Sequence, residues 1–414
     1  MLVKFAHFAD VHLGYHKSDA LKRLEKYAFT HSIDRCISDN VDFVLMCGDI
    51  FHNNIPDMRV QKMAMEQFRR LYDSGIPVYV VYGSHDFSPI SNSVIDLFVA
   101  AGYMIKPRGV ALESGNIGLD FITDPKTGAK IAGLGGLKVG RDRDYYENLE
   151  RTPLESESGF KIFLFHGGIT EMMDTIADDG MPVSLLPKGF AYYAGGHMHE
   201  HQNEHFSGYN HVVYPGTLFA GHSSDMENSA KGQRRGFVIV EFDSTVKSID
   251  FIDVPTCDYV LIVVDADMQT SDHVQDEITT KITSISTNDK VVILRIFGEL
   301  LRGRTTDVDL RAVRQQLLDN GAIDVIIHRR EFTSKEYDIR GEPAGTMEEV
   351  EIKTFQDNIK QISMKRDHLI GDRGVTLAQS ILSSTRIKQP DNETSADYAH
   401  RISSDVISRM ELDV

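Results

Sequence analysis

The chain has 414 residues, of which 41% are hydrophobic and 25% charged, and its formal net charge at pH 7 is −17. These proportions are typical of a globular protein, and the length exceeds that of one ordinary core, so we expect more than one domain. The apolar runs are shorter than a membrane span, which needs roughly 18 residues, and we expect no membrane contact. The negative charge excludes indiscriminate binding to nucleic acid, because the mean field repels a polyanion.

The amino-terminal residues and the cysteines indicate the compartment. Residues 1–9 lack a basic leader and a small-residue cleavage site, so we expect a first strand and not a signal peptide. Cys36, Cys47 and Cys257 are an odd and widely spaced set, which predicts neither a disulfide framework nor a Cys-rich zinc module. A reducing cytoplasm fits this pattern.

Strands and helices alternate in the first half of the chain, which predicts an α/β core with a largely buried sheet. Short apolar runs rich in β-branched and aromatic residues predict strands at residues 2–9, 41–47, 76–82, 161–165 and 189–194. Apolar residues at helical spacing predict helices at residues 20–38 and 58–72. Residues 108–158 are rich in Gly, Asp and Lys, and we expect surface loops there.

The composition changes near Pro255 and again beyond Phe332, which predicts three domains with the bounds 1–254, 255–333 and 334–414. In the second, strand patterns at residues 259–265, 291–296 and 323–328 predict a small βαββ-like unit. The third begins with a hinge at residues 341–345 and continues as a helical tail. Apolar residues at a spacing of three or four predict one apolar face on each tail helix, formed by Met347, Val350, Phe355, Ile359, Ile362 and Leu369 and by Tyr398, Ile402, Val406 and Met410.

Each predicted strand of the first half is followed by a carboxylate, an imidazole or both. These residues are Asp10 and His12, Asp49, His85 and Asp86, His166, and His197 and His199. Ligands of α/β sheets collect at the carboxyl ends of strands, and side chains two apart in extended chain face the same way. A single Asp or His after a strand usually caps an element or lies in a solvated turn. Such residues after all five predicted strands instead predict a common site.

Mixed Asp and His ligands favour borderline divalent ions such as Mn²⁺, Fe²⁺ or Zn²⁺ over Ca²⁺. Two ions need a bridging carboxylate, and Asp49 in its Gly-Asp turn is our candidate. Such a pair activates a water for attack on phosphorus, and His85 would protonate or stabilise the leaving oxygen. Other histidines lack this spacing, and we expect them to be structural or exposed: His7, His16, His31 and His211.

The order of these motifs resembles that of the calcineurin-like metallophosphoesterases. More narrowly, residues 9–14 and 48–52, with Pro56, resemble the Mre-eleven/SbcD family, the nuclease subunit of the double-strand-break repair complex. Residues 295–303 are similar to that family's capping domain. The resemblance implies an α/β metallophosphoesterase sandwich, a small α+β capping domain and a helical C-terminal tail that binds the ATPase partner.

The resemblance also implies a role for each motif residue. Asp10, His12 and His199 would hold one ion, and His166 and His197 the other, with Asp49 between them, while His85 and His52 would contact the phosphate. The family has an Asn ligand where this chain has Ser84, which we expect to be a poorer ligand of the second ion. The implied cofactors are two Mn²⁺ per subunit, with Mg²⁺ or another divalent ion as the alternative.

The implied function is that of a Mn²⁺-dependent DNA exonuclease and endonuclease, which hydrolyses phosphodiester bonds at double-strand-break ends. Its implied partners are DNA ends, a coiled-coil SMC-like ATPase and a second copy of the chain, and its implied location is the nucleoid. The alternatives are a phosphatase or small-molecule phosphodiesterase, and a metal-poor scaffold subunit. Serine-threonine phosphatases have Asp-Arg-Gly after the Gly-Asp turn, whereas this chain continues Ile50-Phe51-His52, which favours the nuclease.

Basic clusters and two helices are the candidates for contact with DNA and with a second copy. The candidate phosphate contacts are Arg141 and Arg143, Lys231 with Arg234 and Arg235, Arg302 and Arg304, and Arg329 with Arg330. Arg302 and Arg304 are favoured, because the resemblance places the cap over the active site. Apolar faces at residues 58–72 and 93–101 fit either the core or the homodimer contact of the resembled family.

Overall fold

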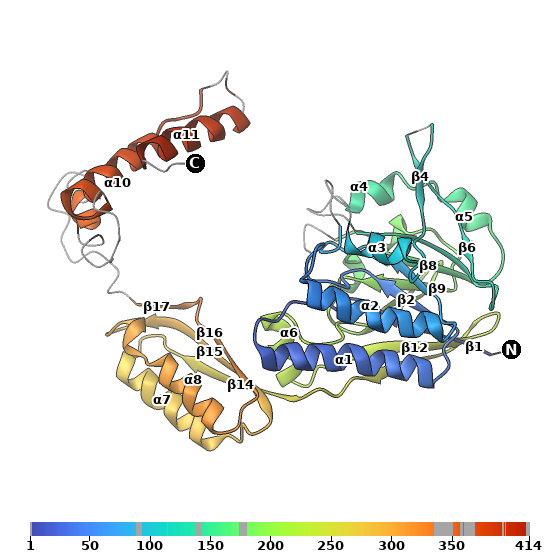
Figure 1. Ribbon diagram of the computed structural model, residues 1–414, viewed down its shortest axis with the longest axis horizontal. Coiled ribbons are helices and arrows are strands. Elements are labelled where there is room, and N and C mark those ends of the chain that lie inside the picture. Colours follow the sequence, from blue (N-terminus) through green and yellow to red (C-terminus); the bar gives the residue numbers. More distant parts are fainter. Residues whose placement is uncertain are drawn as a thin grey trace. The chain divides into compact units, whose positions relative to one another are not determined.

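The chain folds into two units, one of residues Met1–Glu299 with Thr305–Thr333 and one of Leu300–Arg304 with Ser334–Val414. The computed structural model, drawn in Figure 1, describes residues 2–87, 93–113, 115–136, 142–173, 180–334, 351–356, 359, 369–390, 393 and 395–410. Within these residues, no helix combines the length and the apolar character that crossing a membrane requires.

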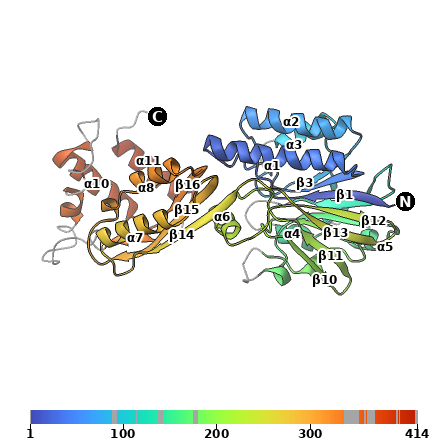
Figure 2. The same cartoon turned by 90° about the horizontal axis from the view of Figure 1, so that it is seen from below.

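The first sheet of the larger unit carries the amino-terminal strands. Its order is β13 (Val246–Asp253), β12 (Gly236–Phe242), β1 (Val3–Phe8), β2 (Phe43–Cys47) and β3 (Val78–Val81). Strands β1, β2 and β3 are mutually parallel, so their carboxyl ends lie at one edge of the sheet. The connecting helices are α1 (Asp19–Ser38), α2 (Met58–Asp73) and α3 (Val94–Ala100), which lie along this sheet (Figure 2).

A second sheet packs against the first. Its order is β10 (Gln202–Phe206), β11 (Tyr209–Tyr214), β9 (Tyr192–Gly196), β8 (Lys161–His166), β7 (Lys130–Leu134) and β6 (Ile122–Thr123). The expectation of surface loops over residues 108–158 was therefore wrong for β6 and β7. The same segment also contains β4 (Gly109–Ala111), β5 (Ile117–Leu119), α4 (Asp142–Glu147) and α5 (Thr152–Ser156). Although this segment is polar in composition, strand β7 is almost wholly buried, because it pairs with β8 inside the sheet.

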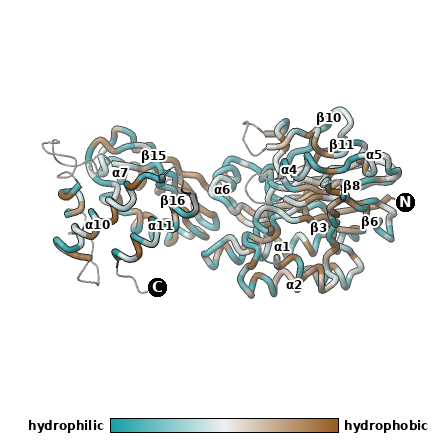
Figure 3. Tube along the Cα trace, turned by 90° about the horizontal axis from the view of Figure 1, so that it is seen from above, coloured by the Kyte–Doolittle hydropathy of each residue, from teal (hydrophilic) through white to brown (hydrophobic). Residues whose placement is uncertain are grey.

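Alternation of side chains along the strands divides the core into layers. In β2, Val44 and Met46 face the helices of the first sheet, whereas Phe43 and Leu45 face the second sheet. Hydrophobic stretches accordingly run through the strands in Figure 3. The result is an α/β sandwich of two packed sheets, as the resemblance implied.

A smaller α/β segment completes the larger unit. It runs in the order β14 (Asp258–Asp265), α7 (Ser271–Ser284), β15 (Lys290–Leu300), α8 (Leu310–Asp319), β16 (Asp324–His328) and β17 (Phe332–Ser334). Strands β14, β15 and β16 are parallel, so the segment is βαβαβ with an added strand and not the expected βαββ-like unit. Helix α8 had been overlooked in the sequence, although Val313 and Leu317 give it a buried face. Val291 and Ile293 of β15 join the hydrophobic core of the first sheet and its helices.

In the smaller unit, helices α10 (Gly371–Thr385) and α11 (Ser395–Arg409) contact each other, and residues 351–356 are also helical. The predicted apolar residues of α11 are half-buried, namely Tyr398, Ile402 and Val406, with Met410 just beyond the helix. The expected hinge at residues 341–345 and the positions Met347, Val350 and Ile362 lie outside the described residues. The division of the chain into domains at residues 254 and 333 stays a prediction.

Candidate metal centre

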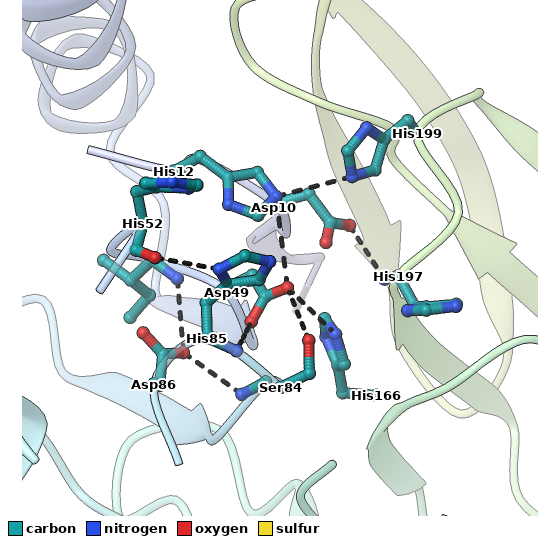
Figure 4. A network of polar contacts seen from close by, with 12 residues as sticks. Asp10, His12, Asp49, His52, Ser84, His85, Asp86, His166, His197 and His199 are labelled. Carbon is teal, nitrogen blue, oxygen red and sulfur yellow. Dashed lines mark hydrogen bonds and ion pairs between the residues drawn. The ribbon is translucent and has the colours of Figure 1, made fainter. Parts of the chain in front are cut away.

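The predicted ligands come together where strands of the two sheets end. Asp10 and His12 follow β1, Asp49 follows β2, and Ser84 and His85 follow β3 of the first sheet. His166 ends β8, and His197 and His199 follow β9, of the second sheet. Strand β2 contacts both β8 and β9, which brings the two sets of side chains to one place (Figure 4).

The backbone at the strand ends is held in an unusual conformation. Asp10, His12 and Asp49 have positive φ angles of 52°, 49° and 50°. Left-handed backbone is uncommon for residues other than glycine, and its clustering is typical of functional sites. Gly196 allows a close approach, because a Cβ atom there would lie 1.9 Å from the carbonyl oxygen of Cys47. These turns point several polar side chains at one centre, which explains why the glycines accompany the motifs.

Asp49 lies between the two groups of candidate ligands. Its Oδ2 atom is 3.9 Å from His12 Nε2 and 3.4 Å from His166 Nε2. The carboxylate also accepts hydrogen bonds from the backbone N–H of His85, at 2.7 Å, and from the Ser84 hydroxyl, at 3.3 Å. This central position fits the predicted bridging role of Asp49.

The charges at the site call for a cation. Burial lowers the pKa of His166, but the adjacent Asp49 carboxylate outweighs burial and raises it to about 10. Burial raises the pKa of Asp10 to about 6, although the positive charges of His166 and His199 act to lower it. Two buried carboxylates thus hold a proton on His166 in the absence of another positive charge, and a divalent ion would supply that charge instead.

Two further observations indicate that these residues are suited to bind metal ions. The Oδ1 atom of Asp10 is buried without a hydrogen-bond partner, and the buried Nε2 atom of His166 has only its ion pair with Asp49, at 3.4 Å. Buried polar atoms are normally satisfied, so such atoms in a cluster indicate ligands for an ion. Ligand atoms within 4.8 Å of one another form three groups, namely Asp10, Asp49 and His166, then His12, His52 and His85, and then His12, His199 and His222.

Hydrogen bonds orient several imidazoles toward the centre. His166 Nδ1 donates to the Cys47 carbonyl at 2.9 Å, which leaves Nε2 facing Asp49. His199 Nδ1 contacts both oxygens of Asp225, at 3.0 and 3.1 Å, which leaves Nε2 facing His12 at 3.4 Å. Such outer partners fix the tautomer and the orientation of metal-binding imidazoles.

His85 and His52 lie side by side at the edge of the cluster. Their rings stack with centroids 5.0 Å apart, and His85 Nδ1 donates to the His52 carbonyl at 2.8 Å. The Nε2 atom of His85 is thereby left available to a substrate. This arrangement fits the predicted contact of both histidines with phosphate.

His197 is placed differently from the other predicted ligands. Its backbone N–H donates to Asp10 Oδ2 at 2.8 Å, but its ring points away from Asp49 in Figure 4. The ring centroid is 5.5 Å from that of His166. His197 therefore contributes its backbone to the observed cluster, and ligation by its imidazole, like that by Ser84, stays a prediction.

Asp86 and His7 have structural roles beside the cluster. The Asp86 carboxylate accepts hydrogen bonds from the backbone of Gly83, at 3.1 Å, and of Phe51, at 3.2 Å, and so joins the second and third strand ends. His7 is fully buried and bonds to Tyr192 and to the Gly195 carbonyl. His7 is therefore structural, as its lack of motif spacing indicated.

The structure adds His222, Asp225 and Tyr15 to the site, which the sequence had not indicated. His222 and Asp225 belong to the start of α6 (Ser223–Ala230), not to a strand end. Tyr15 packs edge-on against His52 with ring centroids 4.6 Å apart. A usable signal was the His-x-x-Asp spacing of residues 222–225, which is that of a capping box at a helix start.

A groove of about 720 Å³ lies beside the cluster, between α6 and the β15–β16 segment. Tyr15 and His222 line it on one side, and Arg329 and Arg330 on the other. Glu227 of α6 spans the two sides, since it contacts His328 at 2.9 Å and Arg295 at 3.3 Å. The groove is lined by basic and acidic side chains together, because Glu227 and Glu331 lie in it with Arg329 and Arg330.

The other basic clusters are engaged elsewhere or belong to the smaller unit. Arg143 pairs with Glu147 and Arg234 with Asp253, while Arg141 lies outside the described residues. Arg235 is buried and donates to the carbonyls of His199 and Asp225, at 2.7 Å each, so its role is to hold the site together. Arg302 and Arg304 belong to the smaller unit, and their contact with DNA stays a prediction.

Comparison with known proteins identifies relatives of the sandwich. Residues 3–201 match the family model described as calcineurin-like phosphoesterase. The chain is 28% identical over 264 residues to the DNA double-strand break repair protein Mre11 of Archaeoglobus fulgidus, an alignment that covers 58% of this chain and 57% of that protein. The aligned part is thus little more than half of that relative.

Two further relatives have the same level of identity. The Mre11 protein of Methanococcus maripaludis is 28% identical over 266 residues, which cover 63% of this chain and 69% of that protein. The uncharacterized metallophosphoesterase YhaO of Bacillus subtilis is 28% identical over 237 residues, which cover 53% of each. The likeness therefore extends to DNA-repair proteins and to a metallophosphoesterase.

Proposed function

Since residues 3–201 form a calcineurin-like phosphoesterase domain, we propose that this protein is a two-metal DNA nuclease that processes double-strand-break ends. The observation that carries the proposal is the convergence of Asp and His side chains from five strand ends on Asp49. The likeness to Mre11 proteins and the arginine-lined groove support DNA as the substrate.

The proposal assigns a role to each side chain of the cluster. Asp10, His12 and His199 would hold one divalent ion and His166 and His197 the other, with Asp49 shared between them. Two such ions, for which Mn²⁺ is our choice, lower the pKa of a bound water and neutralise charge on the phosphoryl group. His85 and His52 would hold the phosphate oxygens, and His85 Nε2 would give a proton to the leaving oxygen.

The test is a nuclease assay on defined single- and double-stranded ends, with Mn²⁺, with Mg²⁺ and with a chelator. A nuclease should cut DNA only when a divalent ion is present. Faster hydrolysis of small phosphoesters than of DNA would favour the phosphatase or small-molecule phosphodiesterase. Metal analysis that finds no bound ion, with no cleavage of either substrate, would favour the scaffold subunit.

His85→Ala should separate chemistry from metal binding. If His85 acts only on the substrate, we expect turnover to fall about 10²- to 10⁴-fold, the range for loss of a general acid, with unchanged metal content. Single-turnover cleavage and metal analysis of the same preparation measure both effects. Loss of metal would make His85 a ligand, and full activity would remove it from the mechanism.

Ser84→Asn should tighten the binding of the second ion. The Ser84 hydroxyl lies 3.3 Å from Asp49 Oδ2, and an amide oxygen at this position would reach farther into the site. We expect the Mn²⁺ concentration for half-maximal activity to fall in the Asn variant. An unchanged Mn²⁺ titration would show that another group or a water already fills the ligand position.

Replacement of Arg329 and Arg330 by Gln tests the groove. Because phosphate contacts add mainly to binding, we expect a higher KM for DNA and a weaker dependence of KM on salt. Hydrolysis of a small phosphodiester should not change, since it does not extend into the groove. The matched control is the double Gln variant of Arg302 and Arg304, the pair favoured from the sequence. A larger loss in that control would return the DNA contact to Arg302 and Arg304.

We also propose a homodimer that forms through α2 and α3. Met58 and Tyr72 on α2 and Leu97 on α3 are 76%, 59% and 58% exposed, so both helices present apolar side chains to solvent. Ile55, just before α2, is 66% exposed. The mass of the protein in solution, compared with that of Met58→Glu, tests this contact.

A further inference from the structure

His222 stands beside the candidate ligands without having been assigned a role by the motifs. Its ring centroid lies 5.5 Å from that of His12 and 5.2 Å from that of His199. One ring nitrogen of each of these three residues lies within 4.8 Å of the other two. This trio of histidines, His12, His199 and His222, is separate from the buried group of Asp10, Asp49 and His166.

The position of His222 is tied to that of His199 through one carboxylate. Asp225 is 3% exposed and contacts His199 Nδ1 through Oδ1 at 3.0 Å. Its Oδ2 atom accepts the backbone N–H of His222 at 2.9 Å. Arg235 donates to the carbonyl oxygens of Asp225 and His199, which anchors the start of α6 to the strand end. The trio is thus built into the fold and does not depend on a free surface side chain.

The spacing of the trio suits a single metal ion. Imidazole nitrogens bind divalent metals at about 2.0–2.1 Å, so two on one ion lie about 3 Å apart at right angles and about 4 Å apart when opposite. His12 Nε2 and His199 Nε2 are already 3.4 Å apart, and a ring nitrogen of His222 lies within 4.8 Å of a ring nitrogen of each. His222 is half-buried and lines the groove, so it approaches the centre from its open side.

We propose that His222 is an additional ligand of the divalent ion held by His12 and His199. The inference rests on the proposed two-metal site and adds a third imidazole to one of its ions. Imidazole ligands favour Mn²⁺, Fe²⁺ and Zn²⁺ over Mg²⁺, which prefers oxygen ligands and bound water. His222 therefore contributes to the selection of the metal, and its place in the groove puts that ion beside the path of the substrate.

The experiment measures metal binding by the full chain without any substrate. Mn²⁺ titration by calorimetry should show that His222→Ala binds one of two ions about 10- to 100-fold more weakly, with a smaller change for Mg²⁺. The visible spectrum of the Co²⁺-loaded protein should change in the same variant. The control is His328→Ala, which removes another imidazole from the groove and should leave both signals as in the wild type.

His222→Ala tests the assignment by a loss of metal affinity, and His222→Cys tests it by the gain of a new absorption band. His222→Cys should add thiolate-to-metal charge-transfer absorption to the Co²⁺ spectrum, because a thiolate at this position would bind the ion directly. Thermal unfolding in chelator should match the wild type for every variant, which shows that each one folds. Unchanged Mn²⁺ affinity in His222→Ala, or no charge-transfer band in His222→Cys, would overturn the assignment. Absence of divalent-ion binding by the wild type would instead overturn the proposed function.

Discussion

Replacement of Asp49 by Ala should abolish hydrolysis in this protein. Its Oδ2 atom faces both His12 and His166, so its loss deprives both proposed ions of a ligand. We expect kcat to fall by more than about 10²- to 10³-fold, the usual loss when one electrostatic stabiliser is removed from an active site. Metal analysis should show reduced occupancy in the same preparation.

The Asp49 variant should nevertheless fold. With Asp49 gone, the largest influence that raises the pKa of His166 is lost, and burial then favours the neutral imidazole. Asp49→Asn is the matched control for structure, because its amide oxygen can still accept the hydrogen bond from the His85 backbone. Circular dichroism and chelator-treated unfolding check both proteins. Near-normal Mn²⁺-dependent cleavage by a folded Asp49→Ala protein would contradict the two-metal reading.

The predicted ends of the five strands lie within two residues of the observed ends, because two simple regularities coincide there. Buried parallel strands appear in sequence as continuous apolar runs, and chemistry at a sheet edge follows directly after them. The run at residues 43–47 and Asp49 after it illustrate both regularities. The clustering of Asp10, His12, Asp49, His166 and His199 could therefore be expected from the sequence.

Other parts of the site depend on contacts between distant segments and left little local signal. Strand β7 is short and contains Lys130 and Gly133, so only its pairing with β8 shows that it is a strand. His222 reaches the cluster because α6 is anchored by Arg235, a residue that appeared in the sequence as part of a basic surface cluster. Arg329 and Arg330 likewise gain their place beside the groove from the fold of the β14–β16 segment.

The smaller unit changes what is expected of the C-terminal tail. The sequence indicated helices without a core of their own, but α10 and α11 contact each other, and Val375 of α10 is only 6% exposed. The tail belongs to the smaller unit, which consists of Leu300–Arg304 and Ser334–Val414.

We propose that the tail binds a coiled-coil ATPase, and truncation after Gly345 tests this proposal. The shortened chain should stay folded, keep Mn²⁺-dependent cleavage of short DNA and lose the ATPase, because helices with apolar faces normally bind in a partner groove or a coiled coil. Pull-down with the ATPase and nuclease assays on the same preparation measure both properties. Normal ATPase binding by the truncated chain would refute the docking role, and aggregation would favour tail helices that pack on the rest of the protein.

Point variants distinguish docking from folding of the tail. Replacement of Phe355 and Ile359 by Asp should also abolish ATPase binding, since a carboxylate in an apolar contact is costly without a partner. Ile359, however, packs against α10, since its Cδ1 atom would lie 3.2 Å from a Cβ atom built on Gly374. The double variant therefore also tests the packing of the tail. Ile407 of α11 is 40% exposed, and Ile407→Asp should weaken ATPase binding without loss of tail helicity. If Ile407→Asp binds normally while the double variant fails only by unfolding its helices, the docking surface lies elsewhere on the chain.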